Sequence, residues 1–253
     1  STAAQRVLLL GDPQQLPQVT QGTHDEPVDA SALAWIAQDA ATMPEDRGYF
    51  IDRTWRLHPD LCSAVSGLSY DGRLLPQPGV TDRRHLEGVA PGVHQVLVPH
   101  RGNSSASSEE AAVVVELVRS LLGRPWRAGT TPDVIDPAEP LQPRGILVVA
   151  GYNAQVNLVR AALDDVGLAQ VRVGTVDRFQ GQEAAVAVVT LAASSAGDAP
   201  RGADFLLNRN RLNVAISRAQ WAAYLVHSPG LDDTLPRGGQ ALADLGAFRR
   251  LTS

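Results

Sequence analysis

The sequence predicts an α/β fold built on a doubly wound, mostly parallel sheet. Short runs of apolar and β-branched residues, typical of strands buried on both faces, lie at 145–150, 184–191 and 221–226. Segments with helical spacing of apolar residues, at 153–166 and 205–220, separate these runs. Strands that alternate with helices in this way form parallel sheets with helices on both faces.

The first hundred residues predict shorter elements. In chain order these are a buried strand at 6–10, a helix at 29–42, a strand at 49–51, a short helix at 61–74, a surface loop at 76–92 and a strand at 92–98. Asp29 or Ser31 is expected to cap the first helix, because short polar side chains accept hydrogen bonds from free helical amides. The second helix is expected to end in a turn at Asp71 and Gly72.

The remaining elements follow from the same signals. Ser107 or Ser108 is expected to cap a helix that runs to Leu122. Residues 123–143 hold five prolines and show no periodicity, which indicates a long exposed insertion, ordered or disordered. Beyond the runs already described, a strand is expected at 171–173 and a helix at 240–248.

The composition excludes several classes of protein. The chain has 253 residues and a formal net charge of −5, so any contact with nucleic acid has to be local. No apolar run approaches the roughly 20 residues of a membrane span, and there is no amino-terminal signal pattern. The single cysteine, Cys62, excludes an internal disulfide and favours a reducing, cytoplasmic location. The six histidines show no metal-ligand spacing, so no metal site is predicted.

Arginine supplies all 22 basic residues, and the sequence contains no lysine. The phosphate-binding P-loop, GxxxxGK[ST], requires a lysine and therefore cannot be present. If this chain binds ATP, it does so without the P-loop that binds the phosphates.

The most informative stretch is VGTVDRFQGQEAAVAVVT at 173–190. It reads as a strand, a polar loop between Gly174 and Gly181, and a second buried strand. Glycines at these two positions permit backbone turns. A polar loop at the end of a buried parallel strand is a common ligand site in α/β folds, but an ordinary solvated turn explains it about as well.

Other polar groups also have two interpretations from the residues alone. The segment 11–17, GDPQQLP, is either an ordinary β-turn or part of a ligand site. Likewise, Trp55 and Arg56 form either a surface cation–π pair or part of a ligand site. The arginines in 205–220 suit a solvated helix face. Tyr152 and Gln155 lie at a strand-to-helix turn, where helix amides can hold a phosphate, and a packing role explains Tyr152 equally well.

Taken together, these segments resemble the superfamily 1 helicases, in the branch that includes the nonsense-mediated-decay RNA helicase and bacterial AAA-type helicase and nuclease relatives. GTVDRFQGQE looks like motif V, RLNVAISRA like motif VI and GDPQQLP like motif III. TWRLHP is similar to the family's QYRMHP, with Thr54, Trp55 and Leu57 as departures, and GYNAQ is similar to TPYxxQ. The blocks cover roughly residues 8 to 226, in the family's order.

The resemblance implies roles for single residues. Gln15, Arg56 and Arg218 are implied to be catalytic at the γ-phosphate, with Arg218 as the arginine finger. ATP binding is implied for these three and for Trp55, which packs near the base, Gly181, and Glu183, which accepts from a ribose hydroxyl. Contacts with nucleic acid are implied for Thr175 and Tyr152.

The resemblance also implies a RecA-like fold of the P-loop NTPase superfamily and a domain division. Residues 1–45 are expected to be a remnant of the first RecA-like domain, cut inside that domain, and 46–253 the second. The whole protein is expected to be an ATP-dependent helicase, acting on single-stranded nucleic acid with 5′–3′ polarity and favouring DNA over RNA. Mg²⁺ ligands are expected mostly on the first domain, and this part alone is not expected to hydrolyse ATP. The alternatives are an inactive interaction module of the same fold and the motor half of a helicase–nuclease fusion.

Overall fold

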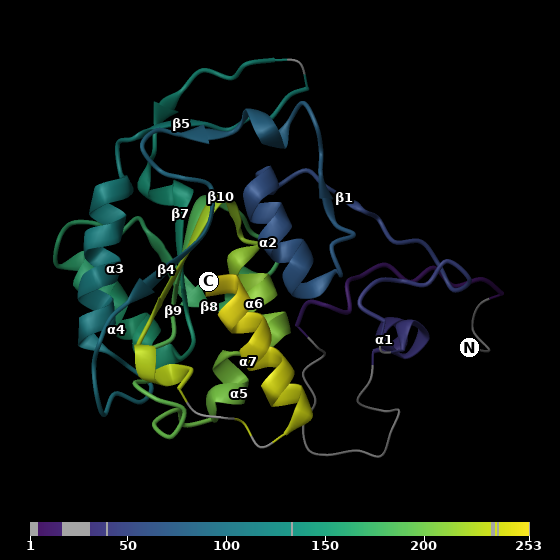
Figure 1. The fold of residues 1–253 in the computed structure, drawn as a ribbon. Coiled ribbons are helices and arrows are strands. Elements are labelled where there is room, and N and C mark those ends of the chain that lie inside the picture. Colours follow the sequence, from purple (N-terminus) through teal and green to yellow (C-terminus); the bar gives the residue numbers. More distant parts are fainter. Residues whose placement is uncertain are drawn as a thin grey trace.

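The computed structural model describes residues 5–16, 31–38, 40–132, 134–233, 236 and 238–252. Its centre is a five-stranded sheet in the order β4-β10-β9-β7-β8, and every pairing in it is parallel (Figure 1). The strands are β4 (Gly92–Leu97), β7 (Ile146–Ala150), β8 (Arg172–Thr175), β9 (Ala184–Thr190) and β10 (Ala219–His227). The predicted fold class, a parallel α/β sheet with helices on both sides, is confirmed.

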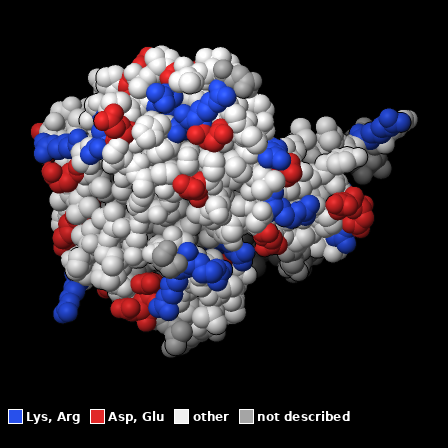
Figure 2. Space-filling model, turned by 45° about the horizontal axis from the view of Figure 1, so that its top comes forward, with Lys and Arg blue, Asp and Glu red and all other residues white. Residues whose placement is uncertain are grey.

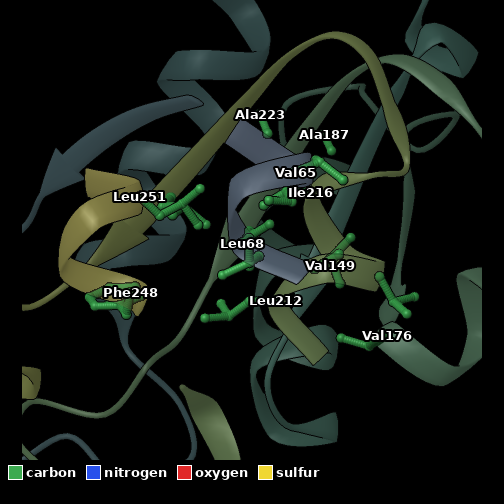
Figure 3. Packing of buried hydrophobic residues seen from close by; sticks show 14 of the residues in the cluster. Val65, Leu68, Val149, Val176, Ala187, Leu212, Ile216, Ala223, Phe248 and Leu251 are labelled. Atoms are coloured by element: carbon green, nitrogen blue, oxygen red, sulfur yellow. The ribbon is translucent and has the colours of Figure 1, made fainter. Parts of the chain in front are cut away.

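Helices cover both faces of this sheet. The helices α3 (Ser108–Leu121) and α4 (Asn153–Asp164) pack on one face, where they bury residues such as Val148 and Val188. The other face is covered by α2 (Pro59–Ser69), α5 (Ala203–Leu206), α6 (Arg209–Ile216) and α7 (Gly239–Thr252). Figure 3 shows Leu68, Leu212 and Phe248 from three of these helices pointing into one cluster with strand residues. Because successive strand residues alternate between faces, each central strand contributes to both cores.

Local sequence explains where the main helices begin. Ser107 caps α3 as expected, since its Oγ accepts a hydrogen bond from the Glu110 amide at 3.1 Å. The predicted helix at 205–220 is divided into α5 and α6, and Asn208 caps α6 by accepting from the Arg211 amide. The turn expected after α2 is present, with Asp71 and Gly72 at φ 50° and 76°.

A second, small sheet corrects two expectations. The strands β3 (His85–Leu86), β5 (Pro125–Arg127) and β6 (Glu139–Pro140) pair antiparallel and lie at the top of Figure 1. Residues 123–143 are mostly exposed as expected, yet they contain two of these strands. The prediction of a surface loop at 76–92 is wrong in part, because residues 85 and 86 form β3, which pairs with β5, and Leu86 is fully buried. Strands of two or three residues are too short to leave a periodic signal.

The amino-terminal part differs most from the expectations. Residues 6–10 form no strand, and Val7, Leu8 and Leu10 are 64%, 81% and 81% exposed. A strand needs a neighbouring strand for its backbone groups, and within the described residues none pairs with this segment. Likewise 49–51 is extended without pairing, and the strand β1 (Arg53–Thr54) follows it, parallel to β2 (Leu75–Pro76).

The first helix, α1 (Ala32–Ala37), is shorter than predicted and is capped by Ser31. The other candidate cap, Asp29, lies outside the described residues, as does Pro17. Among the described residues no helix is both long enough and apolar enough to cross a membrane.

The two glycines of the stretch 173–190 behave differently. Gly181 has φ 82°, so it supplies the turn that was expected. Gly174 lies inside β8 and not in a turn. A Cβ atom there would lie 2.9 Å from Arg178 Cδ and 3.1 Å from the Phe179 ring, so close packing is the reason for glycine at this position.

Candidate active site

A cleft of about 430 Å³ lies at the amino ends of β9 and β10. Glu183 immediately precedes β9 and Arg218 immediately precedes β10, so the sheet fixes both residues side by side. The walls also include Gln15, Trp55, Arg56 and Tyr70. Segments that are far apart in the sequence therefore meet at this cleft.

Arg56 and Glu183 bridge the mouth of the cleft. The Arg56 Nε atom donates to Glu183 Oε2 at 2.7 Å, and Arg56 Nη1 donates to the Ser217 carbonyl at 3.2 Å. The second carboxylate oxygen of Glu183 accepts from Gln220 Nε2 at 3.0 Å. Both charged side chains remain partly exposed, so a ligand entering the cleft can reach them.

Arg218 lies deeper and is only 2% exposed. Its Nε donates to the Val214 carbonyl at 2.8 Å, and its Nη1 donates to the Gln182 carbonyl at 3.2 Å. Burial, with the nearby positive charge of Arg56, lowers the pKa of Arg218 to about 10. The side chain is therefore still charged at neutral pH, and its hydrogen bonds hold the guanidinium in one orientation.

Gln15 reaches the cleft on the segment 11–16, which crosses α6. Its Nε2 donates to Asp12 Oδ2 at 2.9 Å, and its carbonyl accepts from Asn210 Nδ2 at 2.9 Å. The Asn213 Nδ2 donates to the Gln14 carbonyl at 2.8 Å. Sequence reasoning gave no role to these asparagines, although both lie in the RLNVAISRA helix segment or directly before it.

Trp55 lines the cleft and is 56% exposed as a residue, while its carbonyl accepts from Arg84 Nη2 at 3.0 Å. Arg84 is buried, and its Nε and Nη1 have no hydrogen-bond partner among the described residues. Burial lowers the pKa of Arg84. This arginine was also missed, since 76–92 was expected to be a surface loop.

Three other predicted site residues lie outside the cleft. Gly181 shapes the loop before Glu183 without lining the cleft. Thr175 ends β8 and Tyr152 follows β7, so both lie at the carboxyl edge of the sheet, opposite the edge that holds Arg218. The predicted residues thus divide between two edges.

The carboxyl edge carries an aromatic–arginine cluster. The Tyr152 ring stacks on Phe205 with centroids 5.7 Å apart. The guanidinium carbons of Arg201 and Arg211 lie 3.8 and 4.0 Å from the Phe205 centroid. Arg211 also lies 3.7 Å from Asp177, two residues beyond Thr175. Arg201 and Phe205 were missed by sequence reasoning.

Gln155 does not face this edge. It is fully buried, with its Oε1 accepting from the Ser107 amide at 2.7 Å and its Nε2 donating to Thr190 Oγ1 at 3.0 Å. These bonds join α4 to the start of α3 and to β9, so the side chain of Gln155 lies in the interior and away from the carboxyl edge.

Charge is mixed over the surface. Figure 2 shows arginine side chains interspersed with acidic ones on the face drawn, without a large field of one sign. Among the described residues, no group of three or more His, Cys, Asp or Glu side chains is placed to hold a metal ion. An anionic ligand would therefore rely on the local arginines of the two edges.

Comparisons with known proteins show the family of the chain. A family model described as an AAA domain matches residues 36–229. Regulator of nonsense transcripts 1 of Caenorhabditis elegans is 30% identical over 202 residues, which cover 71% of this chain and 17% of that protein. The mouse protein 5′-3′ DNA helicase ZGRF1 is 24% identical over 270 residues, covering 93% of this chain and 13% of that protein.

Among solved structures, the C-terminal domain of a possible DNA helicase from Lactobacillus plantarum WCFS1 matches with a TM-score of 0.41 and 16% identity. The match covers 75% of this chain and 96% of that one. The chain thus spans a small part of the two curated relatives and most of a single solved domain.

Proposed function

Since the chain belongs to the AAA-domain family, as the C-terminal, second RecA-like domain of a superfamily 1 helicase, we propose that it forms half of an ATP-driven motor. The whole protein would hydrolyse ATP to move along single-stranded nucleic acid. One observation carries this proposal, the convergence on a single cleft of Gln15, Arg56, Glu183 and Arg218. We assign residues 46–253 to this second domain and 1–45 to a remnant of the first.

The cleft suits a nucleoside triphosphate. It offers two guanidinium groups for the phosphates, a carboxylate for ribose hydroxyls and an exposed indole face for a base. The buried, unpartnered nitrogens of Arg84 lie behind Trp55 and add positive charge to that wall. The volume of about 430 Å³ falls in the range of small-molecule sites.

Arginine is the appropriate residue for phosphoryl transfer. Charge spreads over the γ-phosphate oxygens as the bond breaks, so positioned cations lower the barrier. In our proposal Arg218 acts as the arginine finger, Arg56 contacts the same phosphate and Gln15 senses it. Arg218 is fixed by backbone carbonyls, whereas Arg56 is held by a partly exposed ion pair worth about 0–1 kcal/mol. A triphosphate would therefore displace Glu183 from Arg56 at little cost.

Glu183 then becomes free to accept from the ribose. A carboxylate accepts hydrogen bonds and donates none, which matches a sugar hydroxyl. Gly181 contributes indirectly, because its positive φ turns the loop that carries Glu183. Trp55 would stack on the base, since its ring is exposed and its backbone is fixed by Arg84.

We place the nucleic-acid strand at the opposite, carboxyl edge. Thr175 would donate its hydroxyl to a phosphate, a contact that is independent of base sequence. Tyr152 lies in the aromatic–arginine cluster, where Arg201 adds exposed positive charge. We propose DNA as the substrate and 5′–3′ as the direction, and the name of the mouse relative supports both.

The first RecA-like domain is the proposed partner, and it would supply most ligands for Mg²⁺. Exposed apolar side chains on the amino-terminal segment and α1 favour a surface that another domain covers, among them Leu8, Leu10 and Trp35. Figure 1 shows α1 to the side of the sheet and its covering helices. The single buried cysteine agrees with a reducing, cytoplasmic location.

The test is ATP turnover by the full-length protein with and without single-stranded nucleic acid. We expect stimulation by the strand, unwinding of a DNA duplex with a 5′ overhang and no turnover by the 253-residue chain alone. A full-length protein that binds single strands but turns over no ATP would be an inactive interaction module instead. A duplex of RNA and one with a 3′ overhang test substrate and direction.

A further inference from the structure

A chain of hydrogen bonds joins the segment that carries Gln15 to the helix that leads to Arg218. Its centre is Tyr70, which follows α2 and is 7% exposed. The Tyr70 hydroxyl donates to Asp12 Oδ2 at 2.6 Å and accepts from Asn213 Nδ2 at 3.0 Å. These contacts span separations of 58 and 143 residues, so they hold together parts of the chain that backbone pairing does not join.

Asp12 accepts hydrogen bonds both from Tyr70 and from residues of its own loop. Its Oδ1 accepts from the Gln14 amide at 2.9 Å, and its Oδ2 accepts from both Gln15 Nε2 and Tyr70. A carboxylate with three donors is held in one position, and so is the side-chain amide of Gln15. Without the tyrosine hydroxyl, the loop would keep its internal bonds but lose its carboxylate-mediated link to α2.

The other end of the chain of bonds leads to Arg218. Asn213 lies in α6, where it contacts both Tyr70 and the Gln14 carbonyl. The next residue, Val214, accepts from Arg218 Nε. Burial lowers the pKa of Arg218 overall, while the negative charge of Asp12 favours the charged guanidinium.

We propose that Tyr70 and Asn213 are positioning residues that keep Gln15 at a fixed place relative to Arg218, so that both meet the same γ-phosphate. This inference rests on the proposed function. Tyr70 is the better probe, because replacing it with phenylalanine removes one oxygen atom and leaves the ring that lines the cleft. The ATP-binding arginines keep their own partners in that variant.

The test is steady-state ATP hydrolysis by the full-length protein carrying Tyr70→Phe. Losing one hydrogen bond to a charged group should lower kcat roughly tenfold. The KM for ATP should stay within about twofold, because most of the proposed binding contacts come from Arg56, Arg218, Glu183 and Trp55, which do not bond to Tyr70. A residue that only stabilised the fold would lower the amount of active enzyme and the Tm, so active-site titration and thermal unfolding accompany the measurement.

Asp12→Asn supplies a second variant. It removes the charge and replaces one acceptor oxygen by a donor nitrogen, which must face at least one of the three donors, so it should reduce kcat at least as much. The double variant should be no worse than Asp12→Asn alone, because both changes break one link. Tyr224→Phe is the matched control; this half-buried tyrosine stacks on His94, away from the cleft, and the change should leave kcat unaltered.

Hydrogen exchange in the same proteins gives a readout that needs no turnover. The amides of Gln14 and Gln15 should exchange roughly tenfold faster in Tyr70→Phe. Unchanged kcat and unchanged exchange would overturn the inference while leaving the proposed function intact. If the wild-type full-length protein turned over no ATP, the proposed function would be wrong. The exchange rates alone would then decide whether Tyr70 holds the loop that carries Gln15.

Discussion

The Arg56 guanidinium and the Glu183 carboxylate, 127 residues apart, form a 2.7 Å ion pair across the mouth of the cleft. The pair joins the segment after β1 to the loop before β9. Each group is one hydrogen-bond partner of the other, and in the proposed function each has a separate ligand group. The ion pair is thus a contact that ATP would replace.

Glu183→Ala should weaken ATP binding more than it slows turnover. The change removes the ribose acceptor and frees Arg56 to move, so we expect KM for ATP to rise roughly tenfold and kcat to fall less. Steady-state kinetics of the full-length protein measure both. Glu116→Ala, on the exposed face of α3, is the matched control. Unchanged KM would refute the ribose role.

Arg218→Ala should abolish most ATP turnover. Arginine fingers of related NTPases contribute about 10³ to 10⁵ in rate, so kcat should fall by that order. Arg218→Lys should not restore it, because an ammonium group cannot reproduce a guanidinium that donates to both Val214 and Gln182 carbonyls. Since Arg218 is buried, thermal unfolding must show that both variants are folded. A folded variant with normal kcat would contradict the assignment.

The sequence was sufficient for the parallel sheet and for the candidate residues of the cleft, because buried strands and ordered motifs leave strong local patterns. It misled at 6–10, where an apolar run looks like a strand although no described neighbour pairs with it. It also missed β5 and β6, which are too short for a periodic pattern. The contacts of Tyr70 with Asp12 and Asn213 link distant segments, and a single sequence carries no sign of such pairs.

The chain should lose stability as the pH falls below about 6.5, partly because of His227. This histidine is fully buried at the end of β10, and burial lowers its pKa. It is neutral in the folded state, where its Nδ1 donates to the Ser228 carbonyl and its Nε2 accepts from Gln95. The unfolded chain binds a proton near the ordinary histidine pKa, so acid favours unfolding between that value and the lower folded pKa.

The measurement is urea unfolding of the chain at several pH values between 7.5 and 5. His227→Gln should reduce the pH dependence by at most about 1.4 kcal/mol per pH unit, the contribution of one proton. The quantity to compare is the slope of the unfolding free energy against pH, because any substitution of a buried residue also lowers stability at every pH. An unchanged slope would show that the folded state accommodates the charged ring.

Arg201→Gln should weaken binding to single-stranded nucleic acid without regard to base sequence. Arg201 is exposed beside Phe205 at the carboxyl edge, where we place the strand, so its charge would neutralise about one phosphate. The slope of log affinity against log salt concentration should fall by about 0.7, the value for one contact with a single strand. Fluorescence anisotropy with a labelled oligonucleotide at several salt concentrations measures this, and Arg119→Gln on α3 is the control of equal charge. If both variants lose affinity equally, the effect is one of net charge, and the strand does not follow the cluster of Tyr152, Phe205 and Arg201.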